Sequence, residues 1–152
     1  MRKWLVLTGA AVSLAALSGL LLSAGSGSLV AGYQPDLARG EAIYAEACAA
    51  CHGADLEGEP DWRSPGPDGR LPAPPHDASG HTWHHSDRVL LDITMRGTAA
   101  VVGGGYESNM PGFADSYSEE ELRDVLEWIK TQWPKRERAH QAQVTAQDEA
   151  TR

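Results

Sequence analysis

Cysteine and methionine are scarce in this chain, which has two cysteines and three methionines among its 152 residues. The two cysteines lie three positions apart, so neither has a partner elsewhere in the chain for a long-range disulfide. No segment alternates apolar and polar residues in the way that predicts a half-buried strand, and no internal repeat occurs. These absences argue against a disulfide-stapled or all-β protein and favour an all-α fold.

Basic residues are also few, because 13 lysines and arginines stand against 21 aspartates and glutamates, for a formal net charge of −8. This balance argues against nucleic acid or an anionic membrane surface as the partner, since both attract positively charged proteins. An acidic protein can be steered toward the basic docking face of a partner protein. The charge is equally explained as a means of keeping a small exported protein soluble.

Charged residues are absent between Trp4 and Pro35, and a dense apolar run from Leu5 to Leu22 follows Arg2 and Lys3. Such a run is long enough to span most of a bilayer as a helix, and it also fits a cleaved signal peptide. We therefore expect residues 1–31 to be a signal peptide or an N-terminal membrane anchor with a linker, with a possible membrane tether through residues 4–24. Both interpretations place the rest of the chain outside the cytoplasm, in the periplasm or on the outer face of the cytoplasmic membrane.

The stretch Cys48-Ala49-Ala50-Cys51-His52 is the most specific motif in the chain. Two thiols at this spacing can bond covalently to the vinyl groups of a haem while the adjacent imidazole reaches the iron. Because an oxidising compartment turns unused thiols into a disulfide, such thioethers imply attachment before oxidation or after re-reduction. We therefore predict that Cys48 and Cys51 carry one covalently bound haem c and that His52 is an axial ligand of the iron.

Helix signals surround this motif. Asp36 is placed to cap a helix from Leu37 to about Ala50, and Ser86 or Asp87 is placed to open a second helix. The sequence Ser118-Glu119-Glu120-Glu121 is a capping box that begins a third helix. Glycine and proline fill residues 53–80, which predicts a long loop that needs a surface to pack on. We expect residues 134–152 to be a polar, flexible tail, because they show no apolar periodicity.

A haem iron bound by an imidazole needs a second axial ligand, and two methionines beyond Met1 are candidates. Met95 lies within the second predicted helix, where filling the core is the usual role of methionine. Met110 stands in Asn109-Met110-Pro111-Gly112-Phe113 after a glycine-rich turn, and Pro111 favours an extended backbone at Met110. Met110 is therefore the favoured iron ligand, and Met95 or a histidine remains the alternative.

These two motifs and the order of the helices resemble the class I, single-haem c-type cytochromes over residues 36–133. The resemblance implies an all-α fold of three to four helices wrapped around one covalently bound haem, with long Pro/Gly-rich loops. It also implies that Gly40, Tyr44 and Trp128 lie where the first and last helices cross. In this family a proline-rich loop offers a carbonyl to the axial imidazole, and Pro72, Pro74 or Pro75 could mark that loop.

Four histidines near Trp83 depart from what a minimal electron carrier requires. They are His76, His81, His84 and His85. One hypothesis is a loop over the haem edge, with Trp83 stacked on the haem and the histidines bonding its propionates or water. A second is a further metal site, such as copper, since clustered imidazoles suit that ion.

The favoured function is one-electron transfer to and from redox protein partners, which needs no separate catalytic residue. The protein could act as a free shuttle, as a tethered carrier or as the haem subunit of a larger oxidoreductase. A thiol-disulfide oxidoreductase that uses Cys48 and Cys51 is one alternative. A zinc site built from Cys48, Cys51, His76 and His81 is another. A peroxidase-like or gas-binding haem protein with an open iron face is a third.

Overall fold

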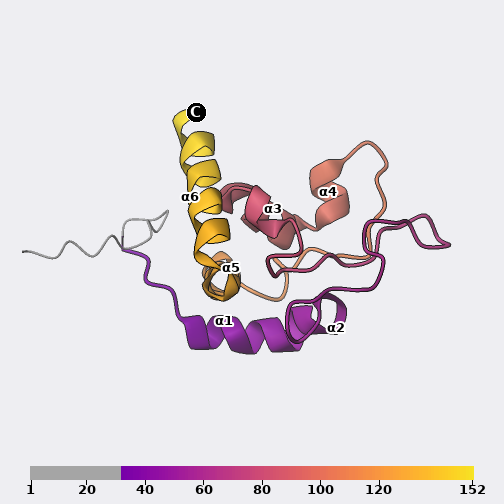
Figure 1. Cartoon of the computed structure of the whole chain (residues 1–152), viewed down its shortest axis with the longest axis horizontal. Coiled ribbons are helices and arrows are strands. Elements are labelled where there is room, and N and C mark those ends of the chain that lie inside the picture. The colour runs from indigo at the N-terminus through magenta and orange to yellow at the C-terminus, as the bar shows by residue number, and fades with distance from the viewer. Residues whose placement is uncertain (1–31) are drawn as a thin grey trace, which may run out of the picture.

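The computed structural model describes residues 32–152, and every regular element in that range is helical (Figure 1). The only strand-like pairing in that range is an isolated antiparallel bridge between Gly97 and Pro111. The prediction of an all-α fold is therefore confirmed. The predicted signal or anchor over residues 1–31 lies outside the described residues. Among residues 32–152 no helix has the length and apolarity needed to cross a membrane.

Six α-helices and two short helical turns follow one another along the described chain. They are α1 (Leu37–Ile43), a π-helical turn (Tyr44–Cys48), α2 (Ala49–His52), a 3-10 turn (Thr82–His84), α3 (Asp87–Arg96), α4 (Thr98–Val102), α5 (Glu119–Gln132) and α6 (Lys135–Ala150). The first three form one continuous helical run that ends at the predicted haem-binding motif. The residues between α2 and the 3-10 turn form the long loop expected from their proline and glycine content.

Side-chain caps set the beginnings of three helices. The Asp36 carboxylate accepts a hydrogen bond of 3.0 Å from the backbone amide of Arg39 at the start of α1. The Ser86 hydroxyl caps α3, so Ser86 rather than Asp87 opens the second helix. At α5, Ser118 and Glu121 each accept from the other's backbone amide, which confirms the predicted capping box.

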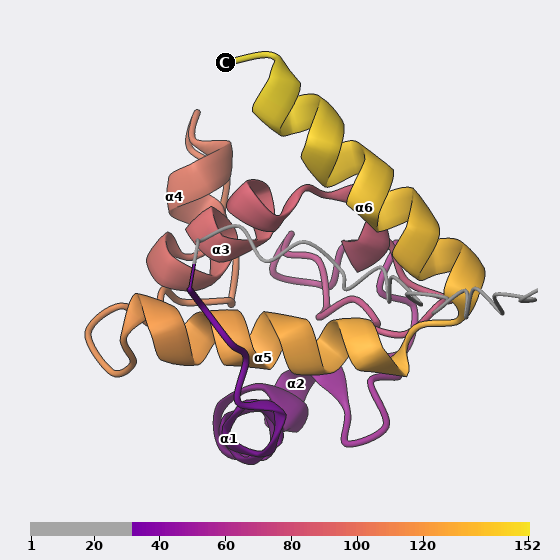
Figure 2. The same cartoon turned by 90° about the vertical axis from the view of Figure 1, so that its left-hand side faces the viewer.

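Helix α1 crosses α5 closely, as Figure 2 shows with α1 seen end-on beneath α5. A Cβ atom at Gly40 would lie 2.2 Å from the backbone oxygen of Asp124, so only glycine permits this approach. One turn further along, the rings of Tyr44 and Trp128 pack with their centroids 4.8 Å apart. The core beside this crossing comprises Ile43, Tyr44, Leu56, Val125, Ile129 and Trp133.

A buried carboxylate ties the same two helices together. Asp124 has no exposed surface, and its oxygens accept from the Arg39 Nε at 2.5 Å and the Asp36 backbone amide at 3.0 Å. The hydroxyl of Tyr33 also donates to it. Burial, followed by this hydrogen bond and the negative charge of Asp124, raises the pKa of Tyr33. Three donors thus compensate the cost of burying one charge.

The predicted flexible tail over residues 134–152 is wrong for most of its length, because residues 135–150 form α6. This helix turns away from the end of α5 and packs against the 3-10 turn Thr82–His84 (Figure 1). Its buried positions are Glu137, Gln141 and Thr145, which recur every four residues. The buried face of α6 is therefore polar, and an apolar periodicity could not reveal it.

The crossing predicts a large effect of adding one methyl group. Gly40→Ala should lower the free energy of unfolding by about 1–3 kcal/mol, because the new atom overlaps the α5 backbone. Denaturant titration of the full-length protein followed by circular dichroism measures this change. Gly66→Ala is the control, since its Cβ would meet only the Asp68 side chain and the Arg70 carbonyl, at 3.3 and 3.6 Å. Equal stability of the two variants would contradict a tight crossing at Gly40.

Candidate functional site

The two cysteines and His52 lie at the end of the helical run that begins with α1. Cys48 closes the π-helical turn, and Cys51 and His52 form the last residues of α2. Gly53, at φ 82°, ends the helix there, and its amide donates to the Ala49 carbonyl at 2.9 Å. His52 is only 6% exposed, while Cys48 is half-buried and Cys51 is exposed. The helix therefore directs the imidazole inward and leaves one thiol at the surface.

The His52 ring is oriented by the proline-rich loop. Its Nδ1–H donates to the Pro74 carbonyl oxygen at 2.8 Å, which identifies Pro74 among the three prolines considered. This bond leaves Nε2 as the nitrogen that can bind a metal. Burial lowers the pKa of His52, and the Pro74 carbonyl opposes this only in part. The ring is thus held neutral, which is the form that coordinates iron.

The loop lies directly on the backbone that follows His52. The amide of Gly58 donates to the His52 carbonyl at 2.7 Å, and the amide of His76 donates to the Leu56 carbonyl at 2.8 Å. A Cβ atom at Gly58 would lie 2.5 Å from the Pro75 nitrogen. Glycine is therefore needed at residue 58 for the proline segment to come within reach of the imidazole.

A second imidazole packs on the first. The rings of His52 and His76 stack with centroids 3.9 Å apart and an interplanar angle of 23°. The Nδ1 of His76 lies 2.8 Å from the Thr82 hydroxyl oxygen, and the indole nitrogen of Trp133 donates to the His76 carbonyl at 2.7 Å. Burial holds the pKa of His76 well below its usual value, so this ring is neutral too.

Sequence reasoning placed His76 with the other three histidines, but the structure separates them. His81 stacks on Trp62, with ring centroids 5.3 Å apart, and also contacts the edge of His85. His84 stacks on Trp83 at 3.7 Å. Within residues 32–152 no three His, Cys, Asp or Glu side chains are placed together to hold a metal ion. The copper and zinc hypotheses therefore have no ligand set in this part of the chain.

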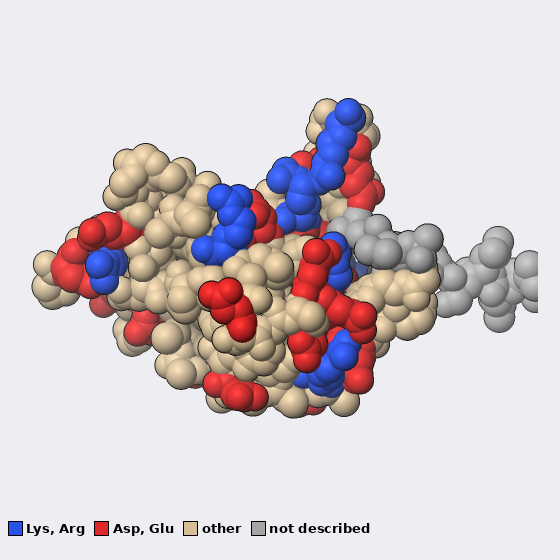
Figure 3. Space-filling model, turned by 180° about the vertical axis from the view of Figure 1, so that it is seen from behind, with Lys and Arg blue, Asp and Glu red and all other residues tan. Residues whose placement is uncertain are grey.

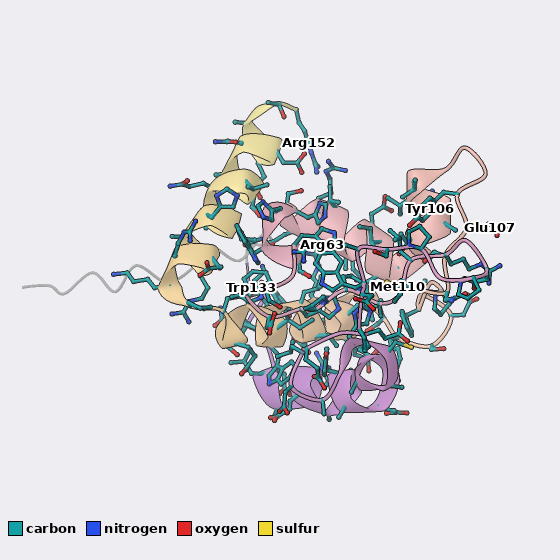
Figure 4. The ribbon with its side chains drawn as sticks, turned by 45° about the vertical axis from the view of Figure 1, so that its right-hand side comes forward. Arg63, Tyr106, Glu107, Met110, Trp133 and Arg152 are labelled. Atoms are coloured by element: carbon teal, nitrogen blue, oxygen red, sulfur yellow. The ribbon has the colours of Figure 1, made fainter. Side chains whose placement is uncertain are left out.

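Met110 is held on a separate segment, beside the end of α3. The bridge between Gly97 and Pro111 fixes this segment, and a Cβ at Gly97 would come within 3.1 Å of the Met110 carbonyl oxygen. The Thr98 hydroxyl lies 3.4 Å from the Met110 sulfur. Figure 4 shows Met110 within the outline of the molecule, whereas Tyr106 and Glu107 lie toward its edge. The other candidate, Met95, lies within α3.

Two buried donors lack a hydrogen-bond partner in the described part of the chain. They are the indole nitrogen of Trp83 and the Nε of Arg70, which lies 3.6 Å from the Glu107 carboxylate. Unpaired buried donors are costly and normally have a partner. A haem carries two propionate groups, which are anionic acceptors. These donors, the thiol pair and the neutral imidazole of His52 together fit a haem.

The contact between Thr82 and His76 yields a testable prediction. Thr82→Val should lower the free energy of unfolding by about 1–3 kcal/mol, because it leaves a buried imidazole nitrogen without its partner. Chemical denaturation of the haem-loaded protein measures the loss. The matched control is Thr131→Val on the exposed face of α5, which should change stability by less than about 0.5 kcal/mol. A Thr82 variant as stable as the control would show that the hydroxyl is not needed.

Comparison with known families and proteins agrees with this geometry. Residues 37–133 match the Cytochrome c family. The chain is also 35% identical over 116 residues to a thiosulfate dehydrogenase of Allochromatium vinosum, covering 69% of this chain and 38% of that protein. No solved structure gives a significant match. The family match covers more than half of the chain and includes the Cys48–His52 motif, whose spacing is that of covalent haem c attachment. The chain therefore belongs to the Cytochrome c family, the c-type cytochromes.

Proposed function

We propose that this protein is a one-electron carrier whose haem c is attached through Cys48 and Cys51 and ligated axially by His52 and Met110. The observation that carries the proposal is the buried, neutral imidazole of His52, oriented by the Pro74 carbonyl at 2.8 Å. When bound, the haem supplies an iron that exchanges one electron between its ferric and ferrous states.

The chain's own residues bind and orient that group. The two thiols tether it, and the Pro74 carbonyl fixes the plane of the His52 ring. The indole N–H of Trp83, which is unpaired in the described part of the chain, and the guanidinium of Arg70, which also lies 3.6 Å from Glu107, can bind the haem carboxylates. The core residues between α1 and α5 exclude water from the side on which His52 lies. Fixed ligands and a dry surrounding are the means by which a protein tunes a haem for electron transfer.

The environment of Cys48 favours a haem carrier over a thiol-disulfide oxidoreductase. Burial, with the neighbouring Cys51 as a smaller cause, raises the pKa of the Cys48 thiol to about 11. Reactive thiols instead have lowered pKa values, because the thiolate is the nucleophile. In addition, a helical run rather than a strand precedes the pair. Both observations argue against thiol exchange at this pair.

The similarity to a thiosulfate dehydrogenase favours a second candidate, in which this chain passes electrons as the haem subunit of a larger oxidoreductase. The chain spans 38% of the length of that relative, so it does not correspond to the whole enzyme. The acidic composition is compatible with a basic docking face on the partner. On the face shown in Figure 3, acidic and basic side chains are interspersed rather than segregated.

The location outside the cytoplasm is also a proposal. It rests on the apolar run that follows Arg2 and Lys3. The membrane tether through residues 4–24 is proposed on the same grounds.

Replacing Met110 tests the axial ligation. Met110→Ala should abolish the weak sulfur-to-iron charge-transfer band of the ferric protein and lower the midpoint potential, because the thioether favours the ferrous state. Mass spectrometry should still find the haem attached. Met95→Ala is the control and should keep the band. If the band survives in the Met110 variant and disappears in the Met95 variant, the assignment is wrong.

Addition of thiosulfate tests whether this chain only carries electrons or itself oxidises the substrate of its relative. The isolated ferric protein should stay oxidised in excess thiosulfate and become fully reduced by dithionite, because an electron carrier lacks a site for the sulfur substrate. Visible absorption of the full-length protein follows both reactions. Rapid reduction by thiosulfate alone would contradict the carrier assignment and indicate an oxidising site within this chain.

A further inference from the structure

Helix α6 follows the part of the chain that matches the Cytochrome c family, and nothing in the proposed function uses it. It packs against the 3-10 turn Thr82–His84, and Figure 2 shows it as a long arm leaving the end of α5. Its buried side chains are polar, so apolar burial contributes little to its docking. Its position depends on specific hydrogen bonds and on the edge contacts of the His140 ring with Trp83 and His84, each with ring centroids 5.3 Å apart.

Gln141 makes the central contacts of this docking. Its Nε2 lies 2.6 Å from an Asp87 carboxylate oxygen and 3.3 Å from the His85 carbonyl oxygen. The Thr145 hydroxyl, one turn along, accepts from the Asp87 amide at 3.1 Å. On the other side of Asp87, the Lys130 Nζ lies 2.5 Å from the same carboxylate oxygen. Gln141 and Asp87 are 4% and 7% exposed, so these bonds are shielded from water.

Asp148 provides a second tie near the end of α6. Its carboxylate accepts two hydrogen bonds from the Arg88 guanidinium, at 2.7 and 2.8 Å, and one from the Ser86 hydroxyl at 2.9 Å. The hydrogen bonds from Arg88 and then Ser86 lower the pKa of Asp148 to about 2. Together with Gln141, this tie fixes residues 85–88, which directly follow the 3-10 turn.

The 3-10 turn is in contact with the residues around His52. The Thr82 hydroxyl lies 3.4 Å from the Pro75 carbonyl, to which it donates, and its oxygen accepts from the His76 Nδ1–H at 2.8 Å. His76 in turn stacks on His52 at 3.9 Å. His85, whose carbonyl accepts from Gln141, donates its amide to the Thr82 carbonyl at 3.1 Å. A continuous series of contacts therefore runs from Gln141 to the His52 imidazole.

We propose that α6 is a strap that positions the axial imidazole, with Gln141 as the positioning residue that acts through Thr82 and His76. This rests on the proposed role of His52 as an iron ligand. By holding the 3-10 turn, the strap keeps the His76 ring stacked on the His52 ring. The His52 ring therefore cannot tilt about its hydrogen bond to the Pro74 carbonyl. Loss of the strap lets water approach the ring and favours the ferric state.

The experiment compares two substitutions on the same helix in the full-length, haem-loaded protein. Gln141→Ala removes the contacts to Asp87 and His85, whereas Gln143→Ala changes an exposed glutamine of α6. Proton NMR of the ferric form reports the orientation of the axial imidazole through the paramagnetically shifted haem methyl signals. We expect Gln141→Ala to shift these signals, lower the midpoint potential and speed hydrogen exchange of the His85 amide. Gln143→Ala should match the unmodified protein in all three.

A double-mutant cycle with His76→Leu tests the route. If the strap acts through the stacked ring, Gln141→Ala should no longer move the methyl signals or the potential in the His76→Leu background. An undiminished effect in that background would overturn the proposal. Unchanged signals and potential in the single Gln141 variant would also overturn it, whether or not amide exchange is faster, because α6 would then be a structural cap only.

The failure of the proposed function is distinguishable from the failure of the strap. If His52 does not bind the iron, the unmodified ferric protein lacks the paramagnetically shifted signals of a coordinated imidazole. The strap then has no axial ligand to position. If those signals are present but unaffected by Gln141→Ala, the function stands and the strap proposal is wrong.

Discussion

The close crossing of α1 on α5 is the constraint on which the rest of the structure depends. Gly40 lets the two backbones meet, and the buried carboxylate of Asp124 fixes the angle by accepting from Arg39 and from the start of α1. Tyr44, packed in this crossing, donates its hydroxyl to the Gly53 carbonyl at 2.8 Å. The crossing thereby sets the position of the helix end that carries the cysteines. A shift of α1 would displace the attachment site as a whole.

The other half of the site is a loop, whose position cannot be set by helix packing. The segment between Gly53 and the 3-10 turn has no regular elements, yet it reaches His52 through the Pro74 carbonyl and His76. Its backbone bonds to the residues just after His52. The 3-10 turn at its far end leads into His85, whose carbonyl accepts from Gln141 of α6. The close crossing of α1 and α5 thus positions the helical part of the site, whereas backbone hydrogen bonds position the loop. The helical part and the loop meet at the His52 imidazole.

The sequence was sufficient for the features that depend on local patterns. The Cys48–His52 motif, the caps at Asp36 and Ser118, and the need for glycine at residue 40 all follow from spacing or from the family resemblance. The stacking of His76 on His52 was missed, because it joins residues 24 positions apart through the course of a loop. The sequence offered three prolines whose carbonyl could accept from the imidazole, and only the folded loop identifies Pro74 as the acceptor.

The sequence pattern could not predict helix α6 in place of a flexible tail over residues 134–152. Amphipathic helices are found in sequences because their buried stripe is apolar, whereas the stripe of α6 is glutamate, glutamine and threonine. Such a polar face can be buried only against groups that form hydrogen bonds with it. Here those groups are Asp87, Arg88 and the His85 carbonyl. A polar interface contributes little net stability but accepts only one register, since any slip leaves buried groups unpaired. The helix is thus suited less to stabilising the domain than to fixing the place of the turn it covers.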